Sequence, residues 1–136
     1  MKISITTDAS RKIDGFTTIP VVMGSVKILD VPRNGCEYLE LFNCIDDIKH
    51  ENIVAEVCQK IRKDGVLSIV GTDLSAMVNG FVNKSMPKEE FVAYVTSKAN
   101  LSSLEDIVNT IRSSGLRVIS SKLNGIFYEV KATRQA

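Results

Sequence analysis

A short apolar run at residues 66–70, VLSIV, constrains the fold more than any other stretch of this chain. A half-buried strand alternates apolar and polar side chains, but four of these five residues are apolar. Such a run suits a strand that is buried on both faces, as in a parallel sheet covered by helices. The run therefore predicts an α/β domain whose sheet is parallel through its middle.

Four helices are predicted from apolar residues at helical spacing or from helix-start signals. They are expected at residues 51–63, at residues 75–82, from Pro87 with the proline in the first turn, and between Ser102 and Gly115. Gly65 is expected to end the first helix, and Asp73 to cap the second. Ser102 and Glu105 have the spacing of a capping box at the start of the last helix. Helices therefore flank the apolar run on both sides.

Six further strands are predicted from alternating or continuous apolar residues. They are expected at residues 2–6, 16–23, 25–31, 36–43, 116–123 and 126–133. Pro20 cannot donate to a sheet ladder, which favours an edge position for its strand. Asn124-Gly125 is the dipeptide most typical of a two-residue hairpin, so the last two strands are expected to pair antiparallel.

Composition and charge exclude two classes of function. The chain has 17 basic and 16 acidic side chains, a net charge of +1, and no long run of one sign. This balance offers no electrostatic surface for nucleic acid or for an anionic membrane. No apolar stretch approaches the ~18 residues that a membrane helix needs. We therefore expect no nucleic-acid partner and no membrane partner.

The cysteines and the single histidine do not indicate a metal site. Cys36, Cys44 and Cys58 are odd in number and lack the spacing of a metal or disulfide motif. They fall in apolar patterns, which predicts buried free thiols in a reducing compartment. His50 lies among charged residues and is interpreted as an exposed residue near a helix start. Since the first residues form a strand pattern rather than a secretion signal, a cytoplasmic location is predicted.

The loop after the first predicted strand reads Thr7-Asp8-Ala9-Ser10. Many α/β proteins bind a ligand with this loop, and glycine is common there because the backbone must approach the ligand closely. This loop has no glycine. It is either a ligand loop that has lost its glycines or a loop that never had this role.

Two segments in the second part of the chain resemble class I S-adenosylmethionine-dependent methyltransferases (methyltransferase type 11-like). Residues 63–74 contain a KDG turn, the apolar strand and a TDL step into a helix, in the order of that family's fifth strand. Residues 102–134 resemble its closing unit, a helix that ends at a glycine, a sixth strand, and a seventh strand that ends in a basic residue. The resemblance covers residues 36–134 well and residues 2–35 loosely.

The resemblance implies a Rossmann-like sheet of seven strands in the order 3-2-1-4-5-7-6, with strand 7 antiparallel, in a single domain of residues 1–136. Some N-terminal helices would be lacking, because only about ten residues separate the first two strands and a crossover helix usually takes a dozen or more. The cofactor would contact the loop after strand 1, acidic residues near strands 2 and 3, and residues after strand 4.

These positions supply the candidate site residues of this chain. Candidates for cofactor binding are Thr7, Asp8, Ala9, Asp30, Phe42 and Asn43. Weak catalytic candidates are Asn43 and Asp46, which stand where related methyltransferases carry a histidine and an acid. Two alternatives stay open: Asp30 could instead cap the turn before Pro32, and Asp46 could instead cap a helix.

The chain departs from the family pattern at two of these positions. The Asp8 carboxylate would lie near the carboxylate of the ligand, an unfavourable arrangement by about 1 kcal/mol or more. Ile19-Pro20 stands where an acid should bind the ribose, so charge-assisted hydrogen bonds of ~1.5–3 kcal/mol each would be lost.

We therefore expect a degenerate methyltransferase-like protein with weak or no catalysis and a binding or assembly role. The alternative is an active small methyltransferase that uses S-adenosylmethionine on an acceptor that the sequence does not name. An unrelated α/β protein is a third possibility. Because missing helices would leave apolar surface uncovered, a homo-oligomer or a protein partner is also predicted.

Overall fold

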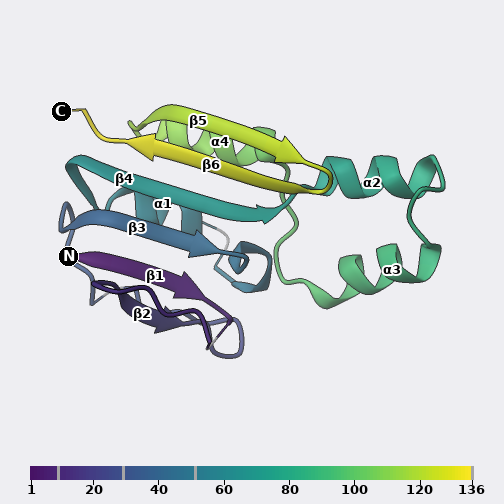
Figure 1. Cartoon of the computed structure of the whole chain (residues 1–136), viewed down its shortest axis with the longest axis horizontal. Coiled ribbons are helices and arrows are strands. Elements are labelled where there is room, and N and C mark those ends of the chain that lie inside the picture. Colours follow the sequence, from purple (N-terminus) through teal and green to yellow (C-terminus); the bar gives the residue numbers. More distant parts are fainter. Residues whose placement is uncertain (9, 29, 51, 136) are drawn as a thin grey trace.

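The computed structural model describes residues 1–8, 10–28, 30–50 and 52–135. These residues form a six-stranded sheet, four α-helices and a single 3-10 turn, η1 (Figure 1). The strands are β1 (Lys2–Thr6), β2 (Thr17–Pro20), β3 (Cys36–Phe42), β4 (Ile61–Thr72), β5 (Arg117–Asn124) and β6 (Phe127–Thr133). The remaining elements are η1 (Ile45–Asp47), α1 (Ile53–Cys58), α2 (Leu74–Val82), α3 (Lys88–Ser97) and α4 (Leu104–Ser113).

The strand order is β2-β1-β3-β4-β6-β5. The pairs β2–β1, β1–β3 and β3–β4 are parallel, whereas β6 runs antiparallel to both of its neighbours, β4 and β5. This confirms the predicted sheet, with its antiparallel strand 7 between strands 5 and 6, except that strand 3 is missing from the described residues. The sheet therefore has six strands rather than seven.

The strand predicted at residues 25–31 is wrong for the residues that the structure describes. Val22 and Ser25 bridge each other across a tight turn, and two further turn bonds follow, from the amide of Ile28 to the carbonyl of Val26 and from Val31 to Ile28. Ile28 and Val31 are nonetheless buried in the core. The alternating apolar residues reach the core through successive turns, so the pattern suggested a strand where none forms.

The first predicted helix is too long. It was expected over residues 51–63, but α1 ends at Cys58 and β4 already begins at Ile61. Ile61 continues the apolar stripe of the helix but is buried as a strand residue paired with Cys36. Gly65 lies within β4 rather than ending a helix, and a Cβ atom there would lie 2.7 Å from the carbonyl oxygen of Cys36. The glycine permits this close strand pairing.

The helices begin within two residues of their predicted starts: α1 begins at Ile53 rather than at 51, and Pro87 precedes α3 as its N-cap rather than lying in its first turn. The capping box of α4 joins Ser103 to Asp106, one residue later than predicted, and each side chain accepts a bond from the other residue's amide. Asp73 caps α2 as predicted: one carboxylate oxygen accepts from the amide of Ala76 at 2.9 Å. Its other oxygen accepts from the amide of Leu104 at 2.7 Å. A single carboxylate thus joins the starts of α2 and α4.

The two faces of the sheet differ in cover. Figure 1 shows α1 and α4 behind the sheet, whereas α2 and α3 extend beyond the carboxyl ends of the parallel strands. Four residues in register across the sheet on the helix-covered face are fully buried; we call them the apolar row, namely Ile5, Leu41, Ile69 and Val130. Their neighbours on the other face, which we call the bare face, form the polar row: Ser4, Glu40, Ser68 and Lys131.

Part of the bare face is covered by the segment between β1 and β2. None of its described residues is helical, as predicted from its length. Arg11 donates two hydrogen bonds to the Glu40 carboxylate, at 2.9 and 3.0 Å, and Ser4 donates a third at 2.6 Å. The Arg11 guanidinium also lies over the Phe42 ring, 3.6 Å from its centroid. A short segment anchored by an ion pair thus stands where a crossover helix would pack.

No helix in the described ranges is both long enough and apolar enough to cross a membrane.

Candidate functional site

A cleft of about 270 Å³ opens at the carboxyl ends of β1, β3 and β4. In open α/β sheets, ligands bind at this edge, where the chain connections leave adjacent strands in opposite directions. The pair β1–β3 is such a point, because β2 precedes it and β4 follows it in the sheet. The residues that line the cleft with polar groups are Thr7, Asn43, Asp46, Asp47, Thr72 and Lys98.

The loop after β1 contributes Thr7 to this cleft, with Asp8 beside it. The Asp8 amide donates to the Thr6 hydroxyl at 3.0 Å. The Asp8 carboxylate accepts from the amide and the hydroxyl of Ser10, at 2.9 and 2.6 Å, and these bonds lower its pKa. Asp8 is therefore an exposed and firmly ionised carboxylate at this edge of the sheet. Ala9, also predicted here, lies outside the described residues.

The turn after β3 contributes the acidic residues that line the cleft. Asn43 has a positive φ of 50°, and its amide donates to the carbonyl of Val70 at 2.8 Å. Asp46 follows in η1 and is only 7% exposed. Burial raises its pKa to about 6, although a hydrogen bond from Tyr94 opposes that shift. Asp46 is thus a carboxyl group that changes its charge close to neutral pH.

The end of α3 closes one side of the cleft through two side-chain contacts. The Tyr94 hydroxyl donates to Asp46 at 2.9 Å, and the Lys98 ammonium lies 3.1 Å from the Asp47 carboxylate. The amides of Ala99 and Asn100 both donate to the carbonyl oxygen of Asp46. No residue of α3 is fully buried, and these contacts join the helix and the loop after it to η1.

Three buried polar atoms near this wall have no hydrogen-bond partner in the described part of the chain. They are the second carboxylate oxygen of Asp46, the hydroxyl of Ser102 and the hydroxyl of Tyr128. Burial, with the Asp46 charge next, raises the pKa of Tyr128. A Cβ atom on Gly71 would lie 2.7 Å from the Tyr128 hydroxyl, so glycine makes room for the phenol.

Among known proteins, this chain is similar to solved structures only. No family model and no curated protein matches the chain. Among solved structures, a Thermotoga maritima S-adenosylmethionine-dependent methyltransferase, described as a possible histamine N-methyltransferase, aligns at a TM-score of 0.62 and 14% identity. The alignment covers 98% of this chain and 73% of that one. A Mesorhizobium loti S-adenosylmethionine-dependent methyltransferase aligns at 0.62 and 8% identity, over 98% and 90% of the two chains.

A third structure is a complex of the Trm112 methyltransferase activator with a methyltransferase from Haloferax volcanii. It aligns at a TM-score of 0.60 and 6% identity, over 94% of this chain and 66% of that one. The chain has the fold of class I methyltransferases. At these identities the likeness shows the fold alone. In the strand numbering of that fold, β2, β1, β3, β4, β6 and β5 are strands 2, 1, 4, 5, 7 and 6.

The methyltransferase-like fold brings together only some of the predicted site residues. Thr7, Asn43 and Asp46 line one cleft, as their places after strands 1 and 4 suggested. Asp30 is exposed and lines a separate hollow beside β2, away from these residues. Phe42 points to the bare face under Arg11. Their assignment to cofactor binding stays a prediction.

A shallower hollow adjoins the cleft at the ends of strands 1 and 2. It shares Thr7 and Asp47 with the cleft, and Val21, Met23 and Lys49 complete much of its lining. β2 ends at Pro20, so its carboxyl end carries no acid, as the sequence indicated. The hollow is thus apolar on the side where an acidic residue was expected.

The structure adds site residues that sequence reasoning missed, chiefly Tyr94, Lys98 and Tyr128. Tyr94 and Lys98 are about 50 residues from their partners Asp46 and Asp47 in the chain. Tyr128 lies in a strand whose pattern indicates only that it faces the core. For these residues the sequence offered one signal, the lysine at position 98 just after α3. A lysine at such a position is equally consistent with a solvent-exposed side chain.

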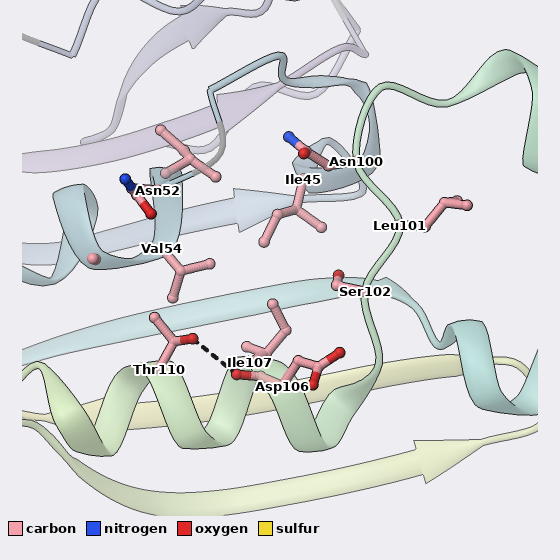
Figure 2. Close-up of a pocket in the computed structure, with 11 residues that line it drawn as sticks. Ile45, Asn52, Val54, Asn100, Leu101, Ser102, Asp106, Ile107 and Thr110 are labelled. Atoms are coloured by element: carbon pink, nitrogen blue, oxygen red, sulfur yellow. Dashed lines mark hydrogen bonds between the residues drawn. The ribbon is translucent and has the colours of Figure 1, made fainter.

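A further pocket lies on the helix-covered face between α1 and α4 (Figure 2). Ile45, Val54 and Ile107 point into it. The Asn100 side-chain amide on its rim already donates to the carbonyl of Ile48, and the Thr110 hydroxyl donates to the carbonyl of Asp106 at 3.0 Å. These two rim groups are bonded within the chain, but the buried hydroxyl of Ser102, which also lines the pocket, has no partner among the described residues.

Proposed function

We propose that this chain is a methyltransferase-like domain that does not carry out ordinary methyl transfer and acts by binding or assembly, in the cytoplasm. The observation that carries the proposal is the loop after β1. There Asp8 presents an ionised carboxylate, and none of the described residues that follow forms a helix.

A helix that follows strand 1 would offer its free backbone amides and its positive dipole end to an anionic ligand group. Here that favourable end is missing, and a negative charge takes its place. The carboxylate of S-adenosylmethionine would meet the Asp8 carboxylate, at a cost on the order of 1 kcal/mol or more. The residues at this position therefore do not fit the cofactor.

The end of strand 2 supports the same conclusion. A ribose needs a hydrogen-bond acceptor there, but Pro20 and Val21 stand at the position. Met23 and the Lys49 stem take up adjoining space: the Lys49 side chain lies so close to Gly24 that a Cβ on that glycine would be 2.6 Å away. The positions for the methionine carboxylate and for the ribose thus both lack the groups that would recognise the cofactor.

A protein partner is consistent with the binding role. One solved structure of similar fold is a methyltransferase in complex with an activator protein. In this chain, the exposed side chains of α2 and α3 and the bare face leave surface that a partner could cover.

Calorimetric titration with S-adenosylhomocysteine tests the proposal, with a full-length class I methyltransferase as positive control. We expect no binding heat at millimolar ligand and an unchanged melting temperature. Micromolar binding by the natural chain would overturn the proposal. An Asp8→Asn variant sharpens the result: if it alone binds, charge repulsion at the loop is the reason that the natural chain does not.

The alternative function is an active small methyltransferase, and Asp46 favours it. A carboxyl group with a pKa of about 6, oriented by Tyr94 at the edge of the cleft, is suited to remove a proton from an acceptor near neutral pH. This alternative requires cofactor binding in the titration. It further requires that Asp46→Asn keep that binding while losing methyl transfer to an amine or hydroxyl acceptor.

A further inference from the structure

Three asparagines in this chain are followed directly by glycine: Asn34, Asn79 and Asn124. In such a pair the backbone nitrogen of the glycine can attack the side-chain carbonyl of the asparagine, because no Cβ atom hinders its approach. A new C–N bond closes a succinimide ring, the C–N bond of the side-chain amide breaks, and ammonia leaves. Water then opens the ring to aspartate, or to isoaspartate, which lengthens the backbone by one methylene group. The reaction needs no enzyme, so the local structure decides its rate.

Helix α2 protects the pair at Asn79. Gly80 is buried inside this helix, so its amide donates to the carbonyl four residues earlier and is not available to attack. The carbonyl of Gly80 in turn accepts from the amide of Met86 and the hydroxyl of Ser85. The end of the helix must therefore open before this pair can react.

A turn protects the pair at Asn34. The Gly35 amide donates to the carbonyl of Pro32, with 3.2 Å between nitrogen and oxygen. A Cβ atom on Gly35 would lie 2.6 Å from the Pro32 ring, so the backbone is closely packed at this point. The attacking nitrogen is thus engaged in a bond that the reaction has to break.

Neither kind of protection exists at Asn124. Gly125 and Ile126 form the loop between β5 and β6, and both Asn124 and Gly125 are exposed. The Gly125 amide donates no hydrogen bond to any residue that the structure describes. A Cβ atom on Gly125 would meet no other atom within 4 Å. The attacking nitrogen is therefore unbonded, and the space around it is open.

We propose that Asn124 is a site of spontaneous deamidation in the folded chain, and that it reacts in preference to Asn34 and Asn79. The three pairs have the same chemistry and differ only in what holds the glycine amide. Asn124 should react at least about ten-fold faster than Asn79, which corresponds to ~1.4 kcal/mol for local opening of the helix. Asn34 should be intermediate. The inference does not depend on the proposed function.

The place of this loop gives the reaction a structural consequence. Asn124 pairs with Phe127, which lines the cleft. The carbonyl of Ile126 accepts from the amide of Asp73 at 2.7 Å, and Asp73 caps α2 and contacts the start of α4. In Figure 1 the turn between β5 and β6 lies beside the start of α2. An isoaspartate at position 124 would lengthen the end of β5 and disturb its pairing with Phe127, so these contacts should weaken.

Peptide mapping by mass spectrometry, after incubation of the folded chain at mildly alkaline pH, tests the site. We expect the acid products to accumulate first at Asn124, next at Asn34 and last at Asn79. Incubation in urea is the matched control, because unfolding removes the protecting bonds and the three pairs should then react at similar rates. Similar rates in the folded chain overturn the proposal, and so does faster conversion at Asn34 or Asn79 than at Asn124.

The melting temperature tests the consequence. The incubated natural chain should melt at a lower temperature than the fresh chain. Asn124→Gln is the control, since its longer side chain closes a ring much more slowly, and its melting temperature should not change on incubation. Fresh Asn124→Asp carries the new charge without the added methylene and should melt close to the natural chain. A natural chain that is modified at Asn124 but melts unchanged would overturn the structural consequence. No cofactor enters these measurements, so their failure is distinct from failure of the proposed function.

Discussion

The apolar row and the polar row belong to the same four strands and differ by one residue in each strand. The apolar row is packed under α1 and α4 and has no contact with solvent. The polar row lies on the face without helices, where Arg11 and Ser4 satisfy the buried Glu40 carboxylate. One face is stabilised by the burial of apolar side chains. The other face has an ion pair between Glu40 and Arg11, which lies in the short segment between β1 and β2. The difference shows how a sheet can retain its order after losing the helices of one layer.

The largest expected effect is a difference in unfolding free energy between the closely packed face and the bare face of the sheet. Leu41→Ala in the apolar row should lower the free energy of unfolding by about 3 kcal/mol, through lost burial and the cavity that remains. Val70→Ala, one strand away on the bare face, should cost about 1 kcal/mol or less, because its side chain is half-buried. Urea denaturation at low protein concentration measures both without a contribution from association. Equal losses would show that the bare face is as well packed as the covered one.

A second test concerns the ion pair on the bare face. Glu40→Gln should cost about 2 kcal/mol, because it leaves a partly buried Arg11 without its charge partner. Burial acts to raise the pKa of Glu40, but bonds from Arg11 and Ser4 outweigh it, so the pKa is lowered. The stabilisation is therefore present above the ordinary glutamate pKa and is lost as pH falls below it.

The control for this test is Glu37→Gln in the same strand. Glu37 pairs with Arg62 at 3.1 Å, but both side chains are substantially exposed. Such a pair contributes about 0–1 kcal/mol. Equal costs of the two substitutions in urea denaturation would mean that the Arg11–Glu40 pair does not take the place of the missing layer.

The smallest expected effect is a pH dependence of stability that comes from Asp46 in the cleft at the edge of the sheet. Because the pKa of Asp46 is raised from 3.8 to about 6, the folded state holds the proton more tightly than the unfolded chain. The resulting stabilisation is complete below the unfolded pKa and is lost as pH rises through the folded one. Between pH 5 and pH 7 the natural chain should therefore lose about 1 kcal/mol relative to Asp46→Asn. Denaturation curves across this range measure the difference, and parallel pH profiles would contradict the burial of an ionisable Asp46.

The sequence predicted most of the sheet and much less of its surroundings. The run at 66–70 and the Asn124-Gly125 hairpin correctly indicated a parallel centre and an antiparallel end, because both signals are local. The loop of the hairpin lies one residue later than predicted, at Gly125 and Ile126, because Asn124 pairs with Phe127. The errors at 25–31 and at the end of α1 have a common cause. Burial explains an apolar pattern equally well whether the residues lie in a turn, a helix or a strand.

The candidate site was predicted in outline only. Thr7, Asn43 and Asp46 follow strand ends, and parallel strands bring such positions to one edge. Their partners are Tyr94 in α3 and Lys98 just after it, and the sequence of this segment contains no signal for the residues that it contacts. Asp30 was assigned to the site because of the resemblance to methyltransferases, but it lies beside β2 and does not line the cleft.

The alternation of side chains along a strand, the caps and the turns are properties of short stretches. The sequence by itself therefore determined most of the strands of the sheet, and the residues that follow β1 and β3 at its edge. Which face would be covered was decided only in the tertiary structure. Whether Arg11 reaches Glu40, and whether Tyr94 reaches Asp46, depends on contacts between residues 29 and 48 positions apart. Such contacts form only after the chain has closed long loops, and their energy depends on burial that no single segment possesses.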